Sequence, residues 1–282
     1  MIVFPNAKIN VGLRILQRRN DGYHDIETVM MPVGWHDILE IVPAQGAEST
    51  LTVYGGNLDG CPAEKNLVMK ALRAVEAAVG NRLDVDIYLQ KIIPDGAGLG
   101  GGSADASFTI KALDGMFGLG LSESDKARIA AGIGADCPFF IYNRPMLATG
   151  TGTDLIDVSL NLSGIKAIAI AKGKGESVST RDAYAGVTPA LLPSGVSLSE
   201  FAALGPENVM AAQQLVNDFE RSVFPLRPDA AALKRHFTLY GAVFSSLSGS
   251  GAAVYGMFKD VKMAEKALRV LENCDTYLHR LH

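Results

Sequence analysis

Residues 94–107, with the sequence PDGAGLGGGSADAS, have the composition best suited to holding a phosphate. Five glycines lie between Gly96 and Gly102, and a helical pattern begins at the serine after them. Glycine loses much backbone entropy on folding, so this density predicts positive φ angles or a close approach to a ligand. Unpaired N–H groups at a helix N-terminus favour an anion. We predict a phosphate cradle rather than a flexible linker, because a linker would not join a strand pattern to a helix pattern.

The spacing of these glycines does not by itself identify the ligand. Gly96, Gly98 and Gly101 fit G-x-G-x-x-G, the fingerprint of dinucleotide-binding proteins. That fingerprint requires a second strand after the helix, whereas this chain continues to another helix start at Ser122. A P-loop is excluded too, since no Gly-Lys-Ser/Thr ends a suitable run. A nicotinamide-dependent oxidoreductase is therefore a weak alternative.

The first strand carries a second pair of candidate residues. Residues 8–16 alternate between polar and apolar types, which predicts a half-buried strand. Lys8 and Asn10 lie on its polar face. They are candidates for a binding site, but two solvated residues on an exposed sheet face would give the same pattern.

Three further candidates each have an ordinary structural explanation. Tyr23 and His24 follow an Asn-Asp-Gly sequence that is typical of a hairpin turn. Asp136 precedes a Cys-Pro step and is compatible with a simple cap between helix and loop. Residues 245–255 place small residues between two apolar strands, as another hairpin would. No single one of these patterns is specific.

The composition limits the class of protein. Of the 282 residues, 48% are hydrophobic and 20% charged, which is normal for one large soluble domain or two modest ones. The net charge of −4 argues against nucleic acid as the main partner. No apolar run is long enough to cross a membrane, and the N-terminus lacks the pattern of a secretion signal. We expect a cytoplasmic protein that contacts neither nucleic acid nor membrane.

The cysteines and histidines predict neither a disulfide framework nor a protein-held metal. Cys61, Cys137 and Cys274 are odd in number and widely separated. The histidines lack the spacing of metal ligands.

The hydrophobic patterns predict a mixture of strands and helices. Strands are expected at 8–16, 26–33, 39–42, 51–53, 85–89, 165–171, 242–247 and 252–258. Helices are expected from Asn66 to Gly80, after the glycine loop, and at 122–131, 207–223, 228–237 and 261–271. Because strands and helices mostly do not alternate as βαβ units, the fold class is α+β.

Taken together, these segments resemble the GHMP kinase superfamily. Its three blocks correspond to residues 5–10, 94–107 and 248–252. Residues 7–10, 21–24, 98–106 and 134–138 are similar to the subgroup that phosphorylates cytidine-diphosphate-methylerythritol. The resemblance implies a two-lobed fold. The N-terminal lobe, 1–155, would be similar to the ribosomal protein S5 domain 2-like fold, and the C-terminal lobe, 156–282, would be ferredoxin-like.

The resemblance also implies catalytic and ATP-binding roles. Asp136 would accept the proton of the attacking hydroxyl, and Lys8 would stabilise the charge on the transferring phosphoryl group. Mg²⁺ would accompany ATP, with the Ser103 hydroxyl near the phosphates or the metal. The ATP loop comprises Pro94, Asp95, Gly96, Ala97, Gly98, Leu99, Gly100, Gly101, Gly102, Ser103 and Ala104.

The implied substrate site rests on five residues. Asn10 would position the erythritol portion, whose 2-hydroxyl receives the phosphate in non-mevalonate isoprenoid precursor biosynthesis. Tyr23 would stack on the cytosine and His24 would hydrogen-bond its edge, with Tyr184 as the second aromatic and Thr180 near a phosphate. A monomer or weak homodimer is expected. One alternative is a homoserine or mevalonate kinase, but the substrates of those enzymes have no base on which Tyr23 could stack. The other is a non-catalytic nucleotide sensor, which would have no use for Lys8 and Asp136.

Two residues depart from the family pattern. Cys137 stands where an aliphatic residue is more common, and little effect is expected. Asp95 places a carboxylate at the entrance of the loop, which would be unfavourable unless it points to solvent or toward a metal.

Overall fold

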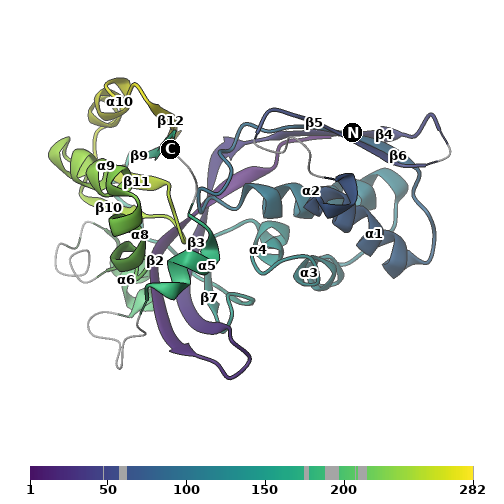
Figure 1. Cartoon of the computed structure of the whole chain (residues 1–282), viewed down its shortest axis with the longest axis horizontal. Coiled ribbons are helices and arrows are strands. Elements are labelled where there is room, and N and C mark those ends of the chain that lie inside the picture. Colours follow the sequence, from purple (N-terminus) through teal and green to yellow (C-terminus); the bar gives the residue numbers. More distant parts are fainter. Residues whose placement is uncertain are drawn as a thin grey trace. The chain divides into compact units, whose positions relative to one another are not determined.

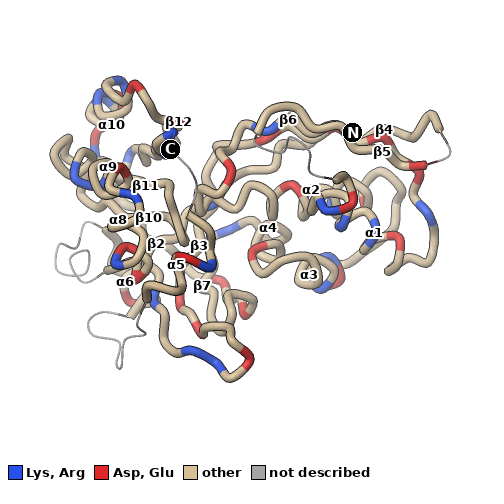
Figure 2. The backbone as a smooth tube through the Cα atoms, in the orientation of Figure 1, with Lys and Arg blue, Asp and Glu red and all other residues tan. Residues whose placement is uncertain are grey.

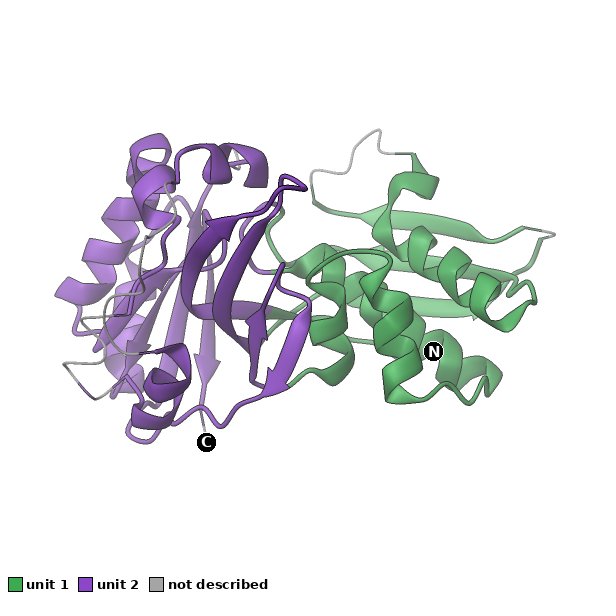
Figure 3. Ribbon diagram, turned by 90° about the horizontal axis from the view of Figure 1, so that it is seen from below, with its two compact units in different colours: residues 1–7, 34–95, 100–144 green, residues 8–33, 96–99, 145–282 purple. Residues whose placement is uncertain are grey.

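The structure is a computed structural model that describes residues 1–46, 48–56, 62–174, 178–187, 197–206, 208 and 215–281. It contains two compact units (Figure 3). Unit 1 comprises residues 1–7, 34–95 and 100–144, and unit 2 comprises residues 8–33, 96–99 and 145–282. The units thus alternate along the chain, whereas the sequence analysis places a single boundary after residue 155. The reason is that the first two long strands and the glycine loop each contribute residues to both units.

Unit 1 consists of a four-stranded sheet and the helices beside it (Figure 1). The sheet order is β1-β4-β6-β5, with β5 parallel to β6 and the other pairs antiparallel. Its core joins strand residues such as Leu39 and Ile87 to helix residues such as Leu72 and Ile110. The elements are β1 (Ile2–Val3), β4 (Ile38–Pro43), β5 (Thr50–Tyr54), η1 (Ala63–Lys65), α1 (Leu67–Val79), β6 (Val85–Gln90), α2 (Gly101–Phe117), α3 (Glu123–Ala131) and α4 (Cys137–Tyr142).

The residues predicted to cap the helices of unit 1 do so in the structure. The Asn66 side chain accepts a hydrogen bond from the Val68 amide at 2.9 Å, and Gly80 ends α1 with a φ of 71°. Ser122 caps α3 by accepting a hydrogen bond from the Asp125 amide at 3.0 Å. Helix α2, however, begins at Gly101 rather than at the serine, because the left-handed Gly100 turns the chain into the helix two residues earlier.

Unit 2 contains a sheet with the order β2-β3-β7-β8. Its strands are β2 (Asn6–Arg18), β3 (His24–His36), β7 (Met146–Thr149) and β8 (Asp154–Asp157). The prediction of a half-buried first strand is wrong, since every residue from 7 to 15 is buried, polar ones included. The polar face is covered because other parts of unit 2 pack on it and pair with its side chains.

The second sheet of unit 2 has the order β10-β11-β9-β12 and is antiparallel throughout. With helices α9 and α10 it follows the order β-α-β-β-α-β, the ferredoxin-like arrangement, as predicted for the C-terminal part. The final strand was not predicted, because its polar residues are only partly buried. The elements are β9 (Ala167–Gly173), α9 (Pro228–Leu239), β10 (Phe244–Leu247), β11 (Val254–Phe258), α10 (Val261–Arg269) and β12 (Cys274–Arg280).

Three short helices complete the described part of unit 2: α5 (Thr180–Ala185), α6 (Leu198–Leu204) and α8 (Glu220–Leu226). The helix expected at 207–223 falls partly on 207 and 209–214, which lie outside the described residues, and its described part becomes helical only at Glu220. Cys61 also lies outside them. Figure 2 shows both signs of charge interspersed along the chain. Among the described helices, none is both long and apolar enough for a membrane span.

Candidate active site

The centre of the glycine loop is held by backbone contacts within unit 2. The Lys8 amide donates to the Leu99 carbonyl at 2.9 Å, and the Ala253 amide donates to the Ala97 carbonyl at 3.0 Å. The Ser248 hydroxyl donates to the Gly98 carbonyl, also at 3.0 Å. Residues 97–99 therefore contact both strand β2 and the second glycine-rich turn, residues 248–253.

Two glycines are required where these segments meet. Gly98 has a φ of +74°, and a Cβ there would lie 2.0 Å from the Ser248 carbonyl oxygen. Gly249 has a φ of +54°, and its Cβ would lie 3.1 Å from Asn10 Oδ1 and 3.4 Å from Lys8 Nζ. Both therefore combine positive φ with close approach of the backbone, the two reasons for glycine that the sequence analysis gives.

Lys8 and Asn10 are buried and paired rather than solvated on a free sheet face. Their exposed fractions are 3% and 2%. Lys8 Nζ donates to Asn10 Oδ1, and Asn10 Nδ2 donates to Thr28 Oγ1 at 2.9 Å. The Tyr255 hydroxyl donates to the Asn10 carbonyl at 3.0 Å. Because a buried ammonium group is stable only with partners, these bonds fix a positive charge beside the two glycine-rich turns.

Thr180 and Tyr184, the predicted substrate residues of the C-terminal half, line the same pocket as Tyr23 and His24. This pocket has a volume of about 900 Å³, and we call it the aromatic pocket. The His24 and Tyr184 rings stack in it, with centroids 4.5 Å apart. Tyr23 is 67% exposed. The lining residues are Arg18, Gly22, Tyr23, His24, Thr151, Thr180, Arg181, Tyr184, Ala185 and Val187.

Two positively charged side chains line the aromatic pocket. Arg18 and Arg181 line it, and sequence analysis did not identify either. Burial, and then the positive charge of Arg18, lower the pKa of His24 below its usual value. Two guanidinium groups beside an aromatic pair are suited to a planar base that carries phosphates. Arg181 could have been proposed from the sequence, because it directly follows Thr180, a predicted substrate residue.

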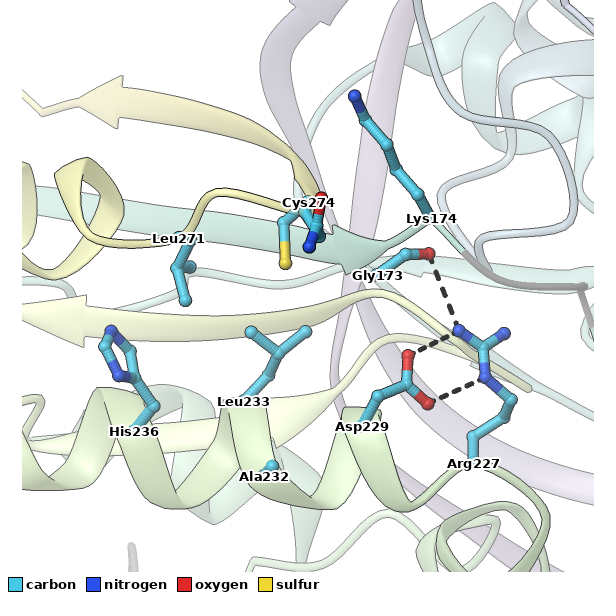
Figure 4. A pocket seen from close by; sticks show the side chains of 10 residues that line it. Gly173, Lys174, Arg227, Asp229, Ala232, Leu233, His236, Leu271 and Cys274 are labelled. Carbon is cyan, nitrogen blue, oxygen red and sulfur yellow. Dashed lines mark hydrogen bonds and ion pairs between the residues drawn. The ribbon is translucent and has the colours of Figure 1, made fainter.

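A second pocket of unit 2, about 780 Å³ in volume, is separate from these residues (Figure 4). Arg227 lies at one end of it, where its guanidinium group is paired with Asp229 and with the Gly173 carbonyl. Leu233, Leu271 and other apolar side chains line the rest. None of the residues that the sequence analysis proposes for the site lies among its lining residues.

A hydrogen bond links the aromatic pocket to the second glycine-rich turn. The Thr180 and Ser250 hydroxyls are 3.5 Å apart. Asn217 holds the same turn, because its Nδ2 donates to the carbonyls of Leu247 and Gly249, each at 2.9 Å. No motif marks Asn217 in the sequence. Within unit 2, the loop centre, Lys8 and Asn10, this turn and the aromatic pocket therefore form one connected set.

The remaining site residues belong to unit 1. Asp136 is half-buried at the start of α4, and Ser103 lies in the first turn of α2. Ser107 Oγ donates to the Cys137 carbonyl at 2.7 Å, which ties these two helices together. Burial, with a smaller effect of Asp136, raises the pKa of the Cys137 thiol to about 11, despite hydrogen bonds with Ser103 and Ser107. Cys137 is therefore a packing residue rather than a nucleophile.

Asp95 is placed against the backbone of unit 1. A Cβ on Gly56 would lie 2.9 Å from Asp95 Oδ2. Gly56 has a φ of +72°, so glycine is favoured there for its conformation. Asp95 is half-buried at the entrance of the loop.

Sequence comparisons identify close relatives along nearly the whole chain. A family model described as "GHMP kinases N terminal domain" matches residues 66–144. A protein of Parabacteroides distasonis named 4-diphosphocytidyl-2-C-methyl-D-erythritol kinase is 44% identical over 264 residues, which cover 92% of each chain. The protein of that name from Bacteroides thetaiotaomicron is 43% identical over 261 residues, again 92% of each chain.

Solved structures give a consistent result. A crystal structure of 4-(cytidine 5'-diphospho)-2C-methyl-D-erythritol kinase has a TM-score of 0.78 at 29% identity, with 100% of both chains covered. The mevalonate kinase of Methanococcus jannaschii has a TM-score of 0.73 at 12% identity, with 100% of this chain and 98% of that chain covered. At 12% identity the likeness concerns the fold alone.

Proposed function

Because the chain belongs to the 4-diphosphocytidyl-2-C-methyl-D-erythritol kinases of the GHMP kinase superfamily, we propose that it transfers the γ-phosphoryl group of ATP to the 2-hydroxyl of that substrate. The predicted superfamily and its α+β fold are confirmed by these matches. The observation that carries the proposed substrate is the aromatic pocket, which joins stacked rings to two arginines.

The nucleotide is assigned to the glycine loop. Its backbone N–H groups, together with the first turn of α2, suit the ATP phosphates, since a helix N-terminus favours negative charge. Glycine at 98 and 249 lets the two glycine-rich turns pack against each other and against strand β2, which holds the loop in place. Residues 94–104 thus remain the proposed ATP-binding segment.

Two residues are assigned to the chemical step. Asp136 is the proposed base, which accepts the proton of the substrate hydroxyl as its oxygen attacks the γ-phosphorus atom. Lys8 is the proposed cation that stabilises the charge on the transferring group, and its bonded partner Asn10 positions the erythritol portion. The role of Asp136 is proposed because residues 134–138 resemble the family motif. The role of Lys8 is proposed for the resemblance of residues 7–10 and because Lys8 is buried beside the two glycine-rich turns.

The cytidine diphosphate portion is assigned to the aromatic pocket. Tyr23 and Tyr184 offer faces on which cytosine can stack, and His24 offers a ring nitrogen to the edge of the base. Neutral histidine has one N–H donor and one acceptor nitrogen, and the lowered pKa of His24 favours that neutral form. Thr180, Arg18 and Arg181 would then hydrogen-bond the diphosphate.

Mg²⁺ is proposed to arrive with ATP. Among the described residues, no group of three or more His, Cys, Asp or Glu side chains could hold a metal ion. Mg²⁺ at nucleotide sites takes most of its ligands from phosphates and water, with few from the protein. Ser103, in the first turn of α2, is the proposed protein ligand nearest the phosphates. When bound, the ion would neutralise phosphate charge. Cytoplasmic residence and a monomeric or weakly dimeric state remain predictions.

A direct assay tests the proposed function. The protein is incubated with MgATP and, separately, with cytidine-diphosphate-methylerythritol, homoserine and mevalonate, while ADP formation is followed and the product is examined by phosphorus NMR. ADP with the first acceptor alone, and a new phosphate on its 2-hydroxyl, is the expected result. ADP with homoserine or mevalonate alone would assign another kinase of the superfamily. ATP binding without ADP from any acceptor would indicate a nucleotide sensor.

A further inference from the structure

A buried cluster of three charged residues in unit 1 takes no part in the proposed reaction. Lys91 Nζ lies 2.5 Å from Asp37 Oδ2 and 2.7 Å from Asp105 Oδ2. The exposed fractions are 0% for Asp37, 7% for Lys91 and 2% for Asp105. Burying three ionisable groups carries a large desolvation penalty, so their arrangement needs an explanation beyond general stability.

The cluster connects the two ends of the glycine loop. Lys91 directly follows β6 and precedes the loop, whereas Asp105 lies in α2 just after the loop. Asp37 also accepts hydrogen bonds at Oδ1 from the amides of Ile92 at 2.5 Å and Ile93 at 2.8 Å. The chain entering the loop is thereby fixed to Asp37, and through Lys91 it is fixed to the helix that leaves the loop.

The first turn of α2 packs directly on this cluster. A Cβ on Gly101 would lie 3.3 Å from Lys91 Nζ and 3.1 Å from a methyl carbon of Ile93. The ammonium group thus lies against the backbone of the helix start that the proposed function assigns to the phosphates. Asp105 Oδ1 is buried and has no hydrogen-bond partner among the described residues, so Oδ2 alone fixes Asp105 to Lys91.

We propose that Asp37, Lys91 and Asp105 form a loop clamp, in which Asp105 is a positioning residue that sets the affinity for nucleotide by holding both ends of the glycine loop. The clamp rests on the proposed function only in taking ATP as the ligand. A loop with fixed ends loses less conformational freedom on binding, so its affinity is higher than that of a loop with free ends.

The test compares two substitutions of Asp105 with one matched control. Asp105→Ala removes the bond to Lys91, and we expect the Kd and KM for ATP to rise about tenfold. The KM for cytidine-diphosphate-methylerythritol and kcat should each stay within about threefold of wild type. Asp105→Asn keeps an oxygen acceptor for Lys91 and should restore ATP affinity to within about threefold. Asp114→Ala, on the same helix, breaks the 2.6 Å pair with Lys126 and should leave ATP affinity unchanged.

The outcomes separate the clamp from the proposed function. ATP binding is measured by calorimetry without any acceptor, so it does not depend on catalysis. A wild type that binds no ATP overturns the nucleotide assignment itself. Wild-type affinity in Asp105→Ala, or an equal loss in Asp114→Ala, overturns the clamp. If circular dichroism shows that Asp105→Ala is unfolded, Asp37→Asn replaces it. The side-chain oxygen of that variant stays with the Ile92 and Ile93 amides, so its NH2 group faces Lys91 and the bond to Lys91 is lost, whereas at Asp105 the amide oxygen is free to face Lys91. Unchanged ATP affinity in Asp37→Asn overturns the clamp too.

Discussion

The imidazole ring of His24 lies against the phenol ring of Tyr184, with 4.5 Å between centroids and 14° between planes. The Phe219 ring also contacts Tyr184 in a T-shaped arrangement, with centroids 4.8 Å apart and 80° between planes. Tyr184 is therefore held in place by two rings, and His24 covers one of its faces. A cytosine that stacks on that face must displace the imidazole.

The first prediction concerns this stack. Tyr184→Leu should raise the KM for the cytidine substrate about tenfold or more, because base stacking contributes roughly 1–3 kcal/mol. The KM for ATP should not change. Tyr184→Phe keeps the ring and is the matched control, for which steady-state kinetics should return nearly wild-type values. An equal loss in both variants would mean that the hydroxyl, rather than the ring, is what matters.

A second prediction concerns the charge around His24. Burial and Arg18 lower its pKa, so NMR titration of the ring should give a value below the usual 6.5 or so. Removing the neighbouring charge by Arg18→Gln should move the pKa partly back toward that value, because burial remains. Arg181→Gln should change it less, since Arg181 is not among the groups that shift this pKa.

The third prediction concerns the proposed base. Asp136→Asn should lower kcat by about 100-fold to 10,000-fold, the range for loss of a general base. ATP binding measured by calorimetry should persist. Asp125→Asn, at a partly exposed carboxylate on α3, is a suitable control and should keep full activity. Turnover near wild type in Asp136→Asn would remove Asp136 from the catalytic assignment.

Gly98 provides a fourth prediction. A side chain in its left-handed conformation costs roughly 1–2 kcal/mol, and here the Cβ would also collide with the Ser248 carbonyl. Gly98→Ala should therefore abolish measurable ATP binding and lower the free energy of unfolding by more than about 2 kcal/mol. Gly118 has a φ of +60°, and a Cβ added there would meet no atom within 4 Å, so Gly118→Ala shows the conformational cost alone. Urea unfolding compares the two.

The fifth prediction is a pH dependence of stability. Burial, and to a smaller degree Asp37, raise the pKa of Asp105 to about 7, against the opposing effect of Lys91. In the unfolded chain this carboxyl loses its proton near pH 4 or so. Between these values the folded state holds more protons, so the contribution of Asp105 to stability falls as pH rises and is constant above about pH 7.

Asp105→Asn lacks this titration. Its free energy of unfolding relative to wild type should therefore rise between about pH 5 and about pH 8, by about 1 kcal/mol or more. Urea unfolding of both proteins at the two pH values measures the difference. A constant difference would show that Asp105 does not titrate in this range.

The sequence predicted best what depends on local backbone chemistry. The cap at Asn66, the helix end at Gly80 and the positive φ of Gly98 follow from neighbouring residues, so short patterns were sufficient. The burial of Lys8 was not predicted, because residues 248–253 and Thr28 cover that strand from far along the chain. Strand β12 was missed for a similar reason, since it is defined by pairing with β9 rather than by its own alternation.

The same limit applies to the candidate site. A motif identified Tyr23 and His24, and the resemblance implied Thr180 and Tyr184. The structure of unit 2 brings these four residues together in one pocket. Arg18 and Asn217 have no motif, because their roles arise from where tertiary packing places an ordinary arginine and asparagine. The roles assigned to Lys8 and Asp136 remain predictions that the experiments above test.

The alternation of the two units along the chain limits how the protein can be divided or recombined. Unit 1 is assembled from three separate stretches, and the glycine loop leaves it after residue 95 and re-enters it at residue 100. No single cut yields an intact half, so a fragment ending at residue 155 would lose β9 to β12 while retaining the strands β2 and β3 that belong mainly to unit 2. A chimera with a relative must therefore exchange residues 8–33 and 96–99 together with everything after 144.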